Sequence, residues 1–167
     1  MHANQRFSCL ISLLHQRPHA AAILRGSPAY PELFGSVGFY QSPYGVFVAA
    51  EVRRLPIPAE TCGNHFFGFH IHSGGSCSGN DTDPFADALG HYNPQNCPHP
   101  SHAGDLPPLL GNQGYACQLF LTDHFTVSEI IDKTVIIHAG FDDFSTQTSG
   151  NAGTKIACGL IRGWNLL

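Results

Sequence analysis

The distribution of apolar residues is the feature that most limits the fold of this chain. Beyond residue 18, apolar runs of about five to ten residues, rich in β-branched and aromatic side chains, alternate with clusters of glycine and proline. With 18 Gly and 12 Pro in 167 residues, turns must be frequent and the elements between them short. No long stretch has the 3.6-residue apolar period of an amphipathic helix. The pattern therefore predicts an all-β fold.

Seven or eight short strands separated by turns are typical of a Greek-key β-sandwich or β-barrel. We predict an eight-stranded fold of this kind with two long functional loops, at residues 73–113 and 139–154, because long irregular loops in a compact domain usually carry function or a metal ion. The barrel domain is assigned to residues 19–167. Residues 1–18 are assigned to an N-terminal extension with a short helix. The strands are expected at residues 19–25, 34–41, 46–55, 65–72, 115–122, 126–131, 134–138 and 156–161.

Composition and charge exclude several classes of protein. Charged residues make up 12% of the chain, the formal net charge is −4 and no run of Lys or Arg is present, so nucleic acid is not expected as a partner. The longest apolar stretches are far shorter than the ~20 residues that cross a bilayer, so no membrane span is expected. Residues 7–14 are apolar, but charged, proline-containing residues follow where a signal peptide has its cleavage site. We therefore predict a cytoplasmic protein, with export to the periplasm as the alternative.

Histidine is the outlier in composition. The chain has 11 His against 8 Lys and Arg together, and most of these histidines lie within residues 65–138. His70 and His72 stand at alternate positions of a predicted strand, so their rings share one face and are spaced to converge on a single ion. For an isolated pair, two surface histidines would be the favoured interpretation. His138 ends another predicted strand in the same way, which favours a metal site.

The loop at residues 90–105 holds four potential ligands among turn-forming residues. These are His91, His99, His102 and Asp105. Three imidazoles and one carboxylate form a closed tetrahedral set that suits a structural Zn²⁺, with Cys97 as an alternative thiolate ligand and a solvated loop rich in His and Asp as the other interpretation. A second, all-imidazole set would suit Cu²⁺. Its members would be His70, His72, His91 and His138. If His91 serves both sites, it bridges two ions as an imidazolate.

Five segments resemble the copper/zinc superoxide dismutases, in the order of that family, and the resemblance covers about residue 19 to the C-terminus. The spacing of His99 and His102 is shorter than in animal members and similar to that of some bacterial ones. The resemblance implies an eight-stranded Greek-key β-barrel with one copper ion and one zinc ion per chain, held by the two ligand sets above. The segments are Gly68-Phe-His-Ile-His72, Gly90-His-Tyr-Asn-Pro94, His102-Ala-Gly-Asp-Leu106, Val135-Ile-Ile-His-Ala139 and Gly150-Asn-Ala-Gly-Thr-Lys-Ile-Ala-Cys-Gly159.

The resemblance also implies an activity, that of an oxidoreductase in antioxidant defence. Superoxide would reduce Cu²⁺ and leave as O₂, and a second superoxide would oxidise Cu⁺, take up two protons and leave as hydrogen peroxide. His91 would part from the reduced copper and take up a proton. The alternative is a copper- and zinc-binding protein for storage, delivery or structure, with little or no turnover. All four copper-facing histidines are present, which favours the enzyme.

Two further features are implied by the resemblance. Asp142 matches an aspartate that accepts hydrogen bonds from one copper ligand and one zinc ligand, here His70 and His99; such a carboxylate fixes the tautomer and direction of the rings. Cys77 and Cys158 occupy the positions of the family's disulfide, which would enclose about 80 residues.

Lys155 stands where the family usually has an arginine that orients the substrate anion. Lysine keeps the charge but loses the planar fork of donors, so we expect reduced rather than absent activity. Residues 139–154 contain acids but no Lys or Arg, so little positive charge is left to steer an anion. The sequence leaves the oligomeric state open, with a homodimer among the options, and assigns no role to Cys9, Cys62, Cys97 and Cys117.

Overall fold

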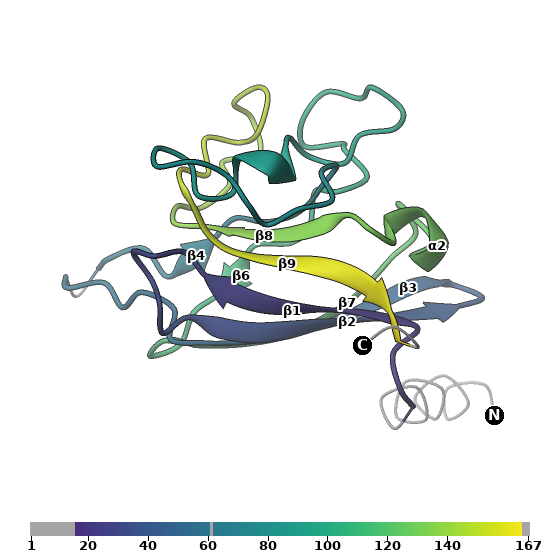
Figure 1. Cartoon of the computed structure of the whole chain (residues 1–167), viewed down its shortest axis with the longest axis horizontal. Coiled ribbons are helices and arrows are strands. Elements are labelled where there is room, and N and C mark those ends of the chain that lie inside the picture. The colour runs from purple at the N-terminus through teal and green to yellow at the C-terminus, as the bar shows by residue number, and fades with distance from the viewer. Residues whose placement is uncertain (1–15, 61, 165–167) are drawn as a thin grey trace.

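Antiparallel pairing joins seven strands into one curled sheet, in the order β5-β8-β9-β1-β2-β3-β7 (Figure 1). The structure is a computed structural model that describes residues 16–60 and 62–164. A second sheet pairs β4 with β6. The elements are β1 (Ala20–Gly26), β2 (Phe34–Ser42), β3 (Gly45–Arg53), β4 (Phe66–Phe67), β5 (Phe69–His72), the 3-10 helix η1 (Ala86–Ala88), β6 (Leu109–Leu110), β7 (Tyr115–Thr122), α2 (Val127–Ile130), β8 (Thr134–His138) and β9 (Lys155–Gly163).

The two sheets together form a barrel. β4 and β5 follow one another with a break only at Gly68. β5 continues the main sheet through β8, whereas β4 pairs with β6, which contacts β7 at the opposite edge of the main sheet. If β4 and β5 are counted as one strand, the described residues form eight strands. The predicted all-β, eight-stranded barrel is confirmed.

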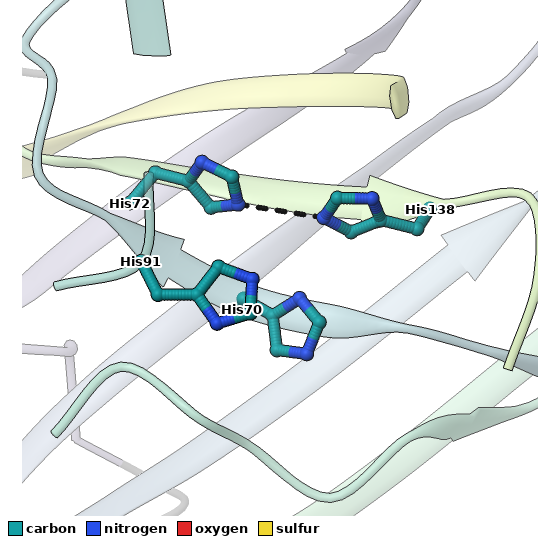
Figure 2. A group of neighbouring side chains, drawn as sticks. All are labelled: His70, His72, His91 and His138. Carbon is teal, nitrogen blue, oxygen red and sulfur yellow. Dashed lines mark hydrogen bonds between the residues drawn. The ribbon is translucent and has the colours of Figure 1, made fainter. Parts of the chain in front are cut away.

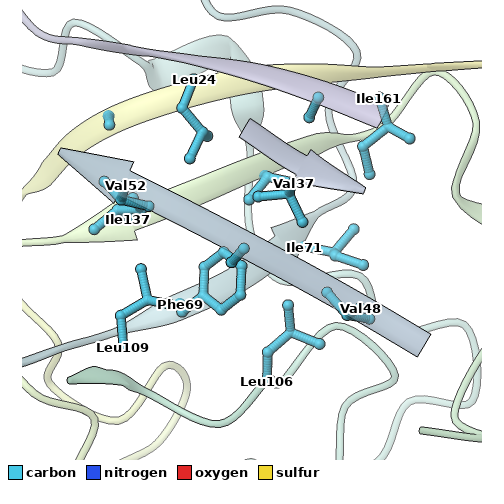
Figure 3. Packing of buried hydrophobic residues seen from close by; sticks show 14 of the residues in the cluster. Leu24, Val37, Val48, Val52, Phe69, Ile71, Leu106, Leu109, Ile137 and Ile161 are labelled. Atoms are coloured by element: carbon cyan, nitrogen blue, oxygen red, sulfur yellow. The ribbon is translucent and has the colours of Figure 1, made fainter. Parts of the chain in front are cut away.

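The core lies inside the curl, where the inward-facing side chains of the strands meet (Figure 3). Alternation is clearest in β3, in which every second residue from Val46 to Val52 is buried. Burying each large apolar side chain contributes about 1.5 to 3 kcal/mol, so this alternation is what holds each strand in register. Fully buried members of the core are Leu24, Val37, Phe39, Val48, Phe69, Ile71, Leu109, Ile137 and Ile161.

One predicted strand is wrong. Residues 126–131 contain the short helix α2 and no strand. Their β-branched residues suggest a strand, but Thr126 and Glu129 form a capping box, in which the Thr126 amide donates to Glu129 Oε2 at 2.6 Å. Val127 and Ile130, three positions apart, then both face the core. The short strand β6 and the helix η1 lie within residues 73–113, where the sequence predicts only irregular structure.

Most of the first long loop, residues 73–113, and the second one, residues 139–154, lie on the same side of the barrel, above β8 in Figure 1, whereas β6 near the end of the first loop lies below β8. No helix in the described part of the chain combines the length and the apolar character that are needed to cross a membrane. The helix predicted through residues 7–14 lies outside the described residues. The arrangement of the loops brings the segments richest in histidine over the outer face of β5 and β8.

Candidate metal centre

Strands β5 and β8 supply three of the histidines. In β5, Phe69 and Ile71 point into the core, so His70 and His72 point to the opposite face of the sheet. The long loops cover that face, and the two imidazoles are therefore almost fully buried. His138 ends the neighbouring strand β8, which pairs with β5.

The loop at residues 90–105 lies along the outer side of β5 in backbone register. The Ile71 amide donates to Gly104 O at 2.9 Å, and the Tyr92 amide donates to Ile71 O at 2.8 Å. Single β-bridges therefore place His91 opposite His72 and Asp105 opposite His70. Gly104 is needed for this approach, because a Cβ there would collide with Ile71 O. Backbone pairing thus carries two of the loop's potential ligands to the histidines of β5.

The first ligand group consists of four imidazoles whose nitrogens lie within 4.8 Å of one another: His70, His72, His91 and His138 (Figure 2). The Nε2 atoms of His72 and His138 face each other at 3.4 Å. His72 Nδ1 donates to Leu89 O at 2.7 Å, and His138 Nδ1 donates to Gly153 O at 3.0 Å. A carbonyl oxygen can only accept, so Nδ1 carries the proton and Nε2 presents a lone pair to the group.

The second ligand group lies beside the first and has the predicted zinc-type donors. Its members are His91, His99, His102 and Asp105, with ligand atoms within 4.8 Å of one another. Asp105 Oδ1 lies 2.7 Å from His91 Nδ1, and Asp105 Oδ2 lies 3.1 Å from His99 Nδ1 and 3.3 Å from His102 Nδ1. The Nδ1 atoms of His91 and His102 are 3.4 Å apart. Cys97, the alternative ligand, is in neither group.

His91 belongs to both groups, and its two nitrogens divide between them. Nδ1 faces Asp105 and His102 in the second group, while Nε2 is buried and has no hydrogen-bond partner. His70 Nδ1 and His99 Nδ1 are also buried without a hydrogen bond. Unpaired buried nitrogens are costly unless they coordinate a metal ion. The imidazoles of the first group and the three imidazoles and carboxylate of the second fit copper and zinc, respectively.

Asp142 connects the two groups through the ring nitrogens of His70 and His99 that are not among the unpaired ones. His70 Nε2 donates to Asp142 Oδ2 at 2.7 Å, and His99 Nε2 donates to Asp142 Oδ1 at 2.9 Å, as expected from the sequence. Burial raises the pKa of Asp142, but hydrogen bonds from His70, the Phe144 amide and His99 outweigh it and bring the pKa well below its ordinary value. The ionised carboxylate therefore fixes both rings with Nδ1 free. Gly150, at φ +67°, lies against it, where a Cβ would collide with Asp142 Oδ1.

Replacing Asp142 with asparagine is expected to weaken the binding of both metals about 10- to 100-fold, because an amide has a single acceptor oxygen and its NH₂ group would face the second ring N–H as a donor. Competition with a chelator of known affinity, monitored separately for copper and zinc, measures this. Asp143→Asn is the matched control, since that carboxylate bonds to Ser145 and Thr146 in its own turn. Equal metal affinities in the two variants would contradict the role of Asp142.

Two imidazoles of the first group, those of His72 and His138, are held neutral even without a metal ion. Burial, followed by the charges of neighbouring imidazoles, lowers the pKa of His72 to about 2; burial and then His70 lower that of His138 to about 3. The unfolded chain protonates both near pH 6.5, whereas the folded chain does not. The contribution of these two rings to the free energy of unfolding is therefore fully present above pH 6.5, and it is lost as the pH falls from there towards 3.

We accordingly expect the free energy of unfolding of the metal-free protein to fall by about 4 kcal/mol between pH 7 and pH 5, about 2 kcal/mol for each of these two histidines. Urea titrations of the chelated protein across this range measure the change. Most carboxylates titrate below this window, so the slope reports imidazoles. A free energy that is constant from pH 7 to pH 5 would show that the rings are not buried in the neutral form.

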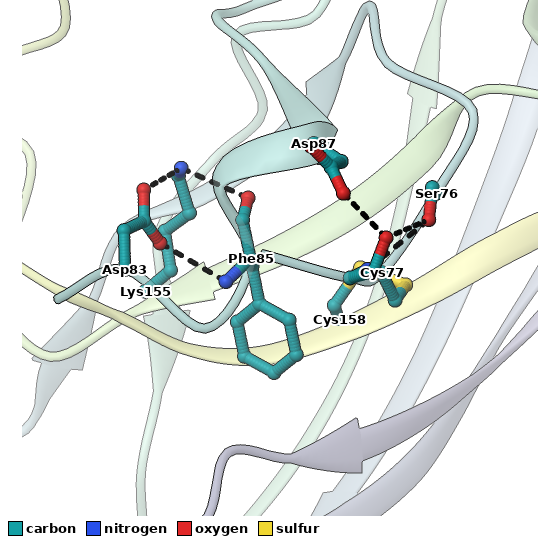
Figure 4. Close-up of a disulfide and its surroundings, with 8 residues drawn as sticks. Ser76, Cys77, Asp83, Phe85, Asp87, Lys155 and Cys158 are labelled. Carbon is teal, nitrogen blue, oxygen red and sulfur yellow. Dashed lines mark hydrogen bonds and ion pairs between the residues drawn. A yellow bond between two sulfur atoms is a disulfide. The ribbon is translucent and has the colours of Figure 1, made fainter. Parts of the chain in front are cut away.

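Gln147 is a site residue that the sequence does not reveal. Its Oε1 accepts from the His99 amide at 3.0 Å and its Nε2 donates to His99 O at 2.8 Å. These two hydrogen bonds join the loop at residues 139–154 to the loop at residues 90–105. No periodicity or motif marks a lone glutamine in a polar loop. The pairing of Cys77 with Cys158, in contrast, is present as the resemblance implies, with Cα atoms 5.7 Å apart (Figure 4).

The fold and these groups define a Greek-key β-barrel protein with two adjacent metal sites that share one histidine. Comparison with known proteins agrees. The family model for copper/zinc superoxide dismutase matches residues 33–161. The Cu-Zn superoxide dismutase of Legionella pneumophila is 35% identical over 140 residues, which cover 79% of this chain and 80% of that protein. The one from Escherichia coli K12 is 34% identical over 142 residues, with 77% and 78% covered.

A solved structure is similar over nearly its whole length. The Cu/Zn superoxide dismutase from Brucella abortus superposes with a TM-score of 0.70 at 25% identity, covering 84% of this chain and 98% of that one. The chain belongs to the copper/zinc superoxide dismutase family. Its relatives named here are bacterial, in agreement with the short spacing between His99 and His102.

Proposed function

We propose that this chain is a superoxide dismutase that binds copper at the first ligand group and zinc at the second. The observation that carries the proposal is the placement of His91, which offers one nitrogen to each group. Copper, when bound, supplies the one-electron couple that dismutation needs. Zinc at a closed set of three imidazoles and one carboxylate supports a structural role for that ion.

The chain's own residues orient the site and handle protons. Leu89 O, Gly153 O and Asp142 hold three of the imidazoles of the first group in one tautomer. His91 Nε2 is buried without a partner, so it is the atom that can hold a proton next to the substrate. A surface cavity bordered by His72, His91 and Lys155 gives a small anion a route to it.

The proposal is tested by refolding the chain with copper and zinc and measuring inhibition of superoxide-driven dye reduction. We expect inhibition that depends on copper, with one copper and one zinc per chain by metal analysis. Protein loaded with zinc alone is the control and should be inactive. Full loading without inhibition would favour the alternative, a metal-binding protein without turnover.

The disulfide supports a location other than the cytoplasmic one predicted from the sequence. Structural disulfides persist in oxidising compartments such as the periplasm and are rare in the cytoplasm. The Cys77–Cys158 bridge therefore favours the alternative of export, which cell fractionation tests. A homodimer stays a prediction, to be measured by analytical ultracentrifugation.

A further inference from the structure

Lys155 lies at the edge of the cavity that leads to the first ligand group. The pairing of β8 with β9 shifts after Ile137, so that Lys155 stands opposite His138. A bulge of this kind re-aims side chains next to functional sites. The cavity is lined by Lys155 together with His72, His91 and His138, and Lys155 is the one Lys or Arg among its lining residues in the described part of the chain. Lys155 is therefore the lining residue whose positive charge can attract an anionic substrate into the cavity.

The ammonium group of Lys155 is already bonded. Its Nζ donates to Asp83 Oδ2 at 2.6 Å and to Phe85 O at 3.1 Å (Figure 4). The side chain is only 15% exposed, so it has little freedom to turn away from these partners. An ammonium has three N–H donors. Two are used within the protein, and one remains for an anion.

Asp83 is held in place by its own loop. Its Oδ1 accepts from the Phe85 amide at 3.0 Å, and its main-chain oxygen accepts from the amides of Asn80 and Ala86. Burial raises the pKa of Asp83, but hydrogen bonds from Lys155 and the Phe85 amide outweigh this and lower the pKa below its usual value. The carboxylate is therefore a fixed negative charge next to the cation of the cavity.

We propose that Asp83 is a positioning residue that determines how strongly the cavity at the first ligand group attracts anions. The inference rests on the proposed function and concerns the strength of substrate attraction. The carboxylate orients Lys155 and at the same time cancels most of its field, since a cation paired at 2.6 Å acts at a distance as a dipole. Removing the negative charge while keeping Lys155 leaves a net positive charge beside His138. The consequence is tighter anion binding and a stronger dependence on salt.

The test uses the copper- and zinc-loaded protein, azide as the anion probe and the variant Asp83→Asn. At low ionic strength we expect azide to bind about 3- to 5-fold more tightly, by titration of the copper absorption band, and salt to weaken the binding more steeply than in the unmodified protein. Superoxide turnover at limiting substrate should rise by a similar factor. Asp83→Ser, which keeps an acceptor for the Phe85 amide, gives the same comparison if the asparagine variant does not fold.

Asp81→Asn is the matched control. It changes the net charge equally in the same loop, but Asp81 is exposed and forms no ion pair with a described residue. We expect its azide affinity to stay within about 1.5-fold of the unmodified value. An azide affinity that rises equally in Asp83→Asn and Asp81→Asn would overturn the proposal, because it would report net charge alone.

A second measurement is independent of turnover. In zinc-loaded, copper-free protein, acetic anhydride should acetylate Lys155 about 3-fold faster in Asp83→Asn, because the amine loses the carboxylate that holds it against the protein. Lys133 is the reference within the same molecule. Unchanged azide affinity together with unchanged Lys155 acetylation refutes the role of Asp83. If both shift as expected while the loaded protein shows no superoxide turnover, the inference about Asp83 stands and the proposed function fails.

Discussion

Replacing His91 with alanine is expected to impair copper and zinc binding together and to lower superoxide turnover about 100-fold or more. Loss of a residue that merely orients a ligand commonly costs 10- to 100-fold in metal affinity or activity, and His91 offers a donor atom to each group. The Nε2 atom of its imidazole is also buried without a hydrogen-bond partner, so it is available to carry a proton into the cavity. Turnover and the content of each metal are measured on the same preparation.

Variants of ligands that belong to only one group test whether His91 binds both metal ions or merely lies close to them. His72→Ala removes a donor from the first group alone, so copper binding should fall while zinc binding stays within about 3-fold. His102→Ala should do the reverse. His124→Ala, on the surface, is the control for loss of an imidazole. Zinc affinity that is unchanged in His91→Ala would show that His91 serves only the first group and would remove the main support for the proposed function.

Loss of the disulfide is expected to lower the free energy of unfolding by about 4 to 5 kcal/mol. The bridge joins residues separated by 81 positions, and a loop of that size is expensive to close without a covalent link. Cys158 also packs with Phe85 and Ile136, so Cys77→Ser leaves a buried thiol next to a polar hydroxyl. Urea denaturation of the metal-free protein under oxidising conditions measures the loss.

The matched control for this variant is Cys117→Ser, which alters an exposed free thiol and should change stability by less than about 0.5 kcal/mol. Reducing the unmodified protein should reproduce most of the effect of Cys77→Ser. A loss below about 1 kcal/mol in both experiments would mean that the unfolded chain is already compact around this loop. In that case the bridge would contribute little to stability.

The strands were predictable from sequence because they depend on local alternation. β3 and β5 place every second side chain on one face, and the same alternation puts His70 and His72 on a common face. The sequence predicts a strand at α2 because β-branched residues favour strands, whereas the capping box that starts the helix spans only four residues. β6 was missed because two residues are too few for any period to show.

By itself, the sequence determined the barrel class and the identity of the potential ligands, because strand period and donor chemistry are properties of neighbouring residues. Only the tertiary structure decided which nitrogen of His91 faces which ligand group, and which other residues contact the side chains of the site. Gln147 reaches His99 across 48 positions, and Asp83 reaches Lys155 across 72. Each of these contacts involves at least one irregular loop that has no periodic pattern, so it forms only when the barrel brings segments distant in the sequence together.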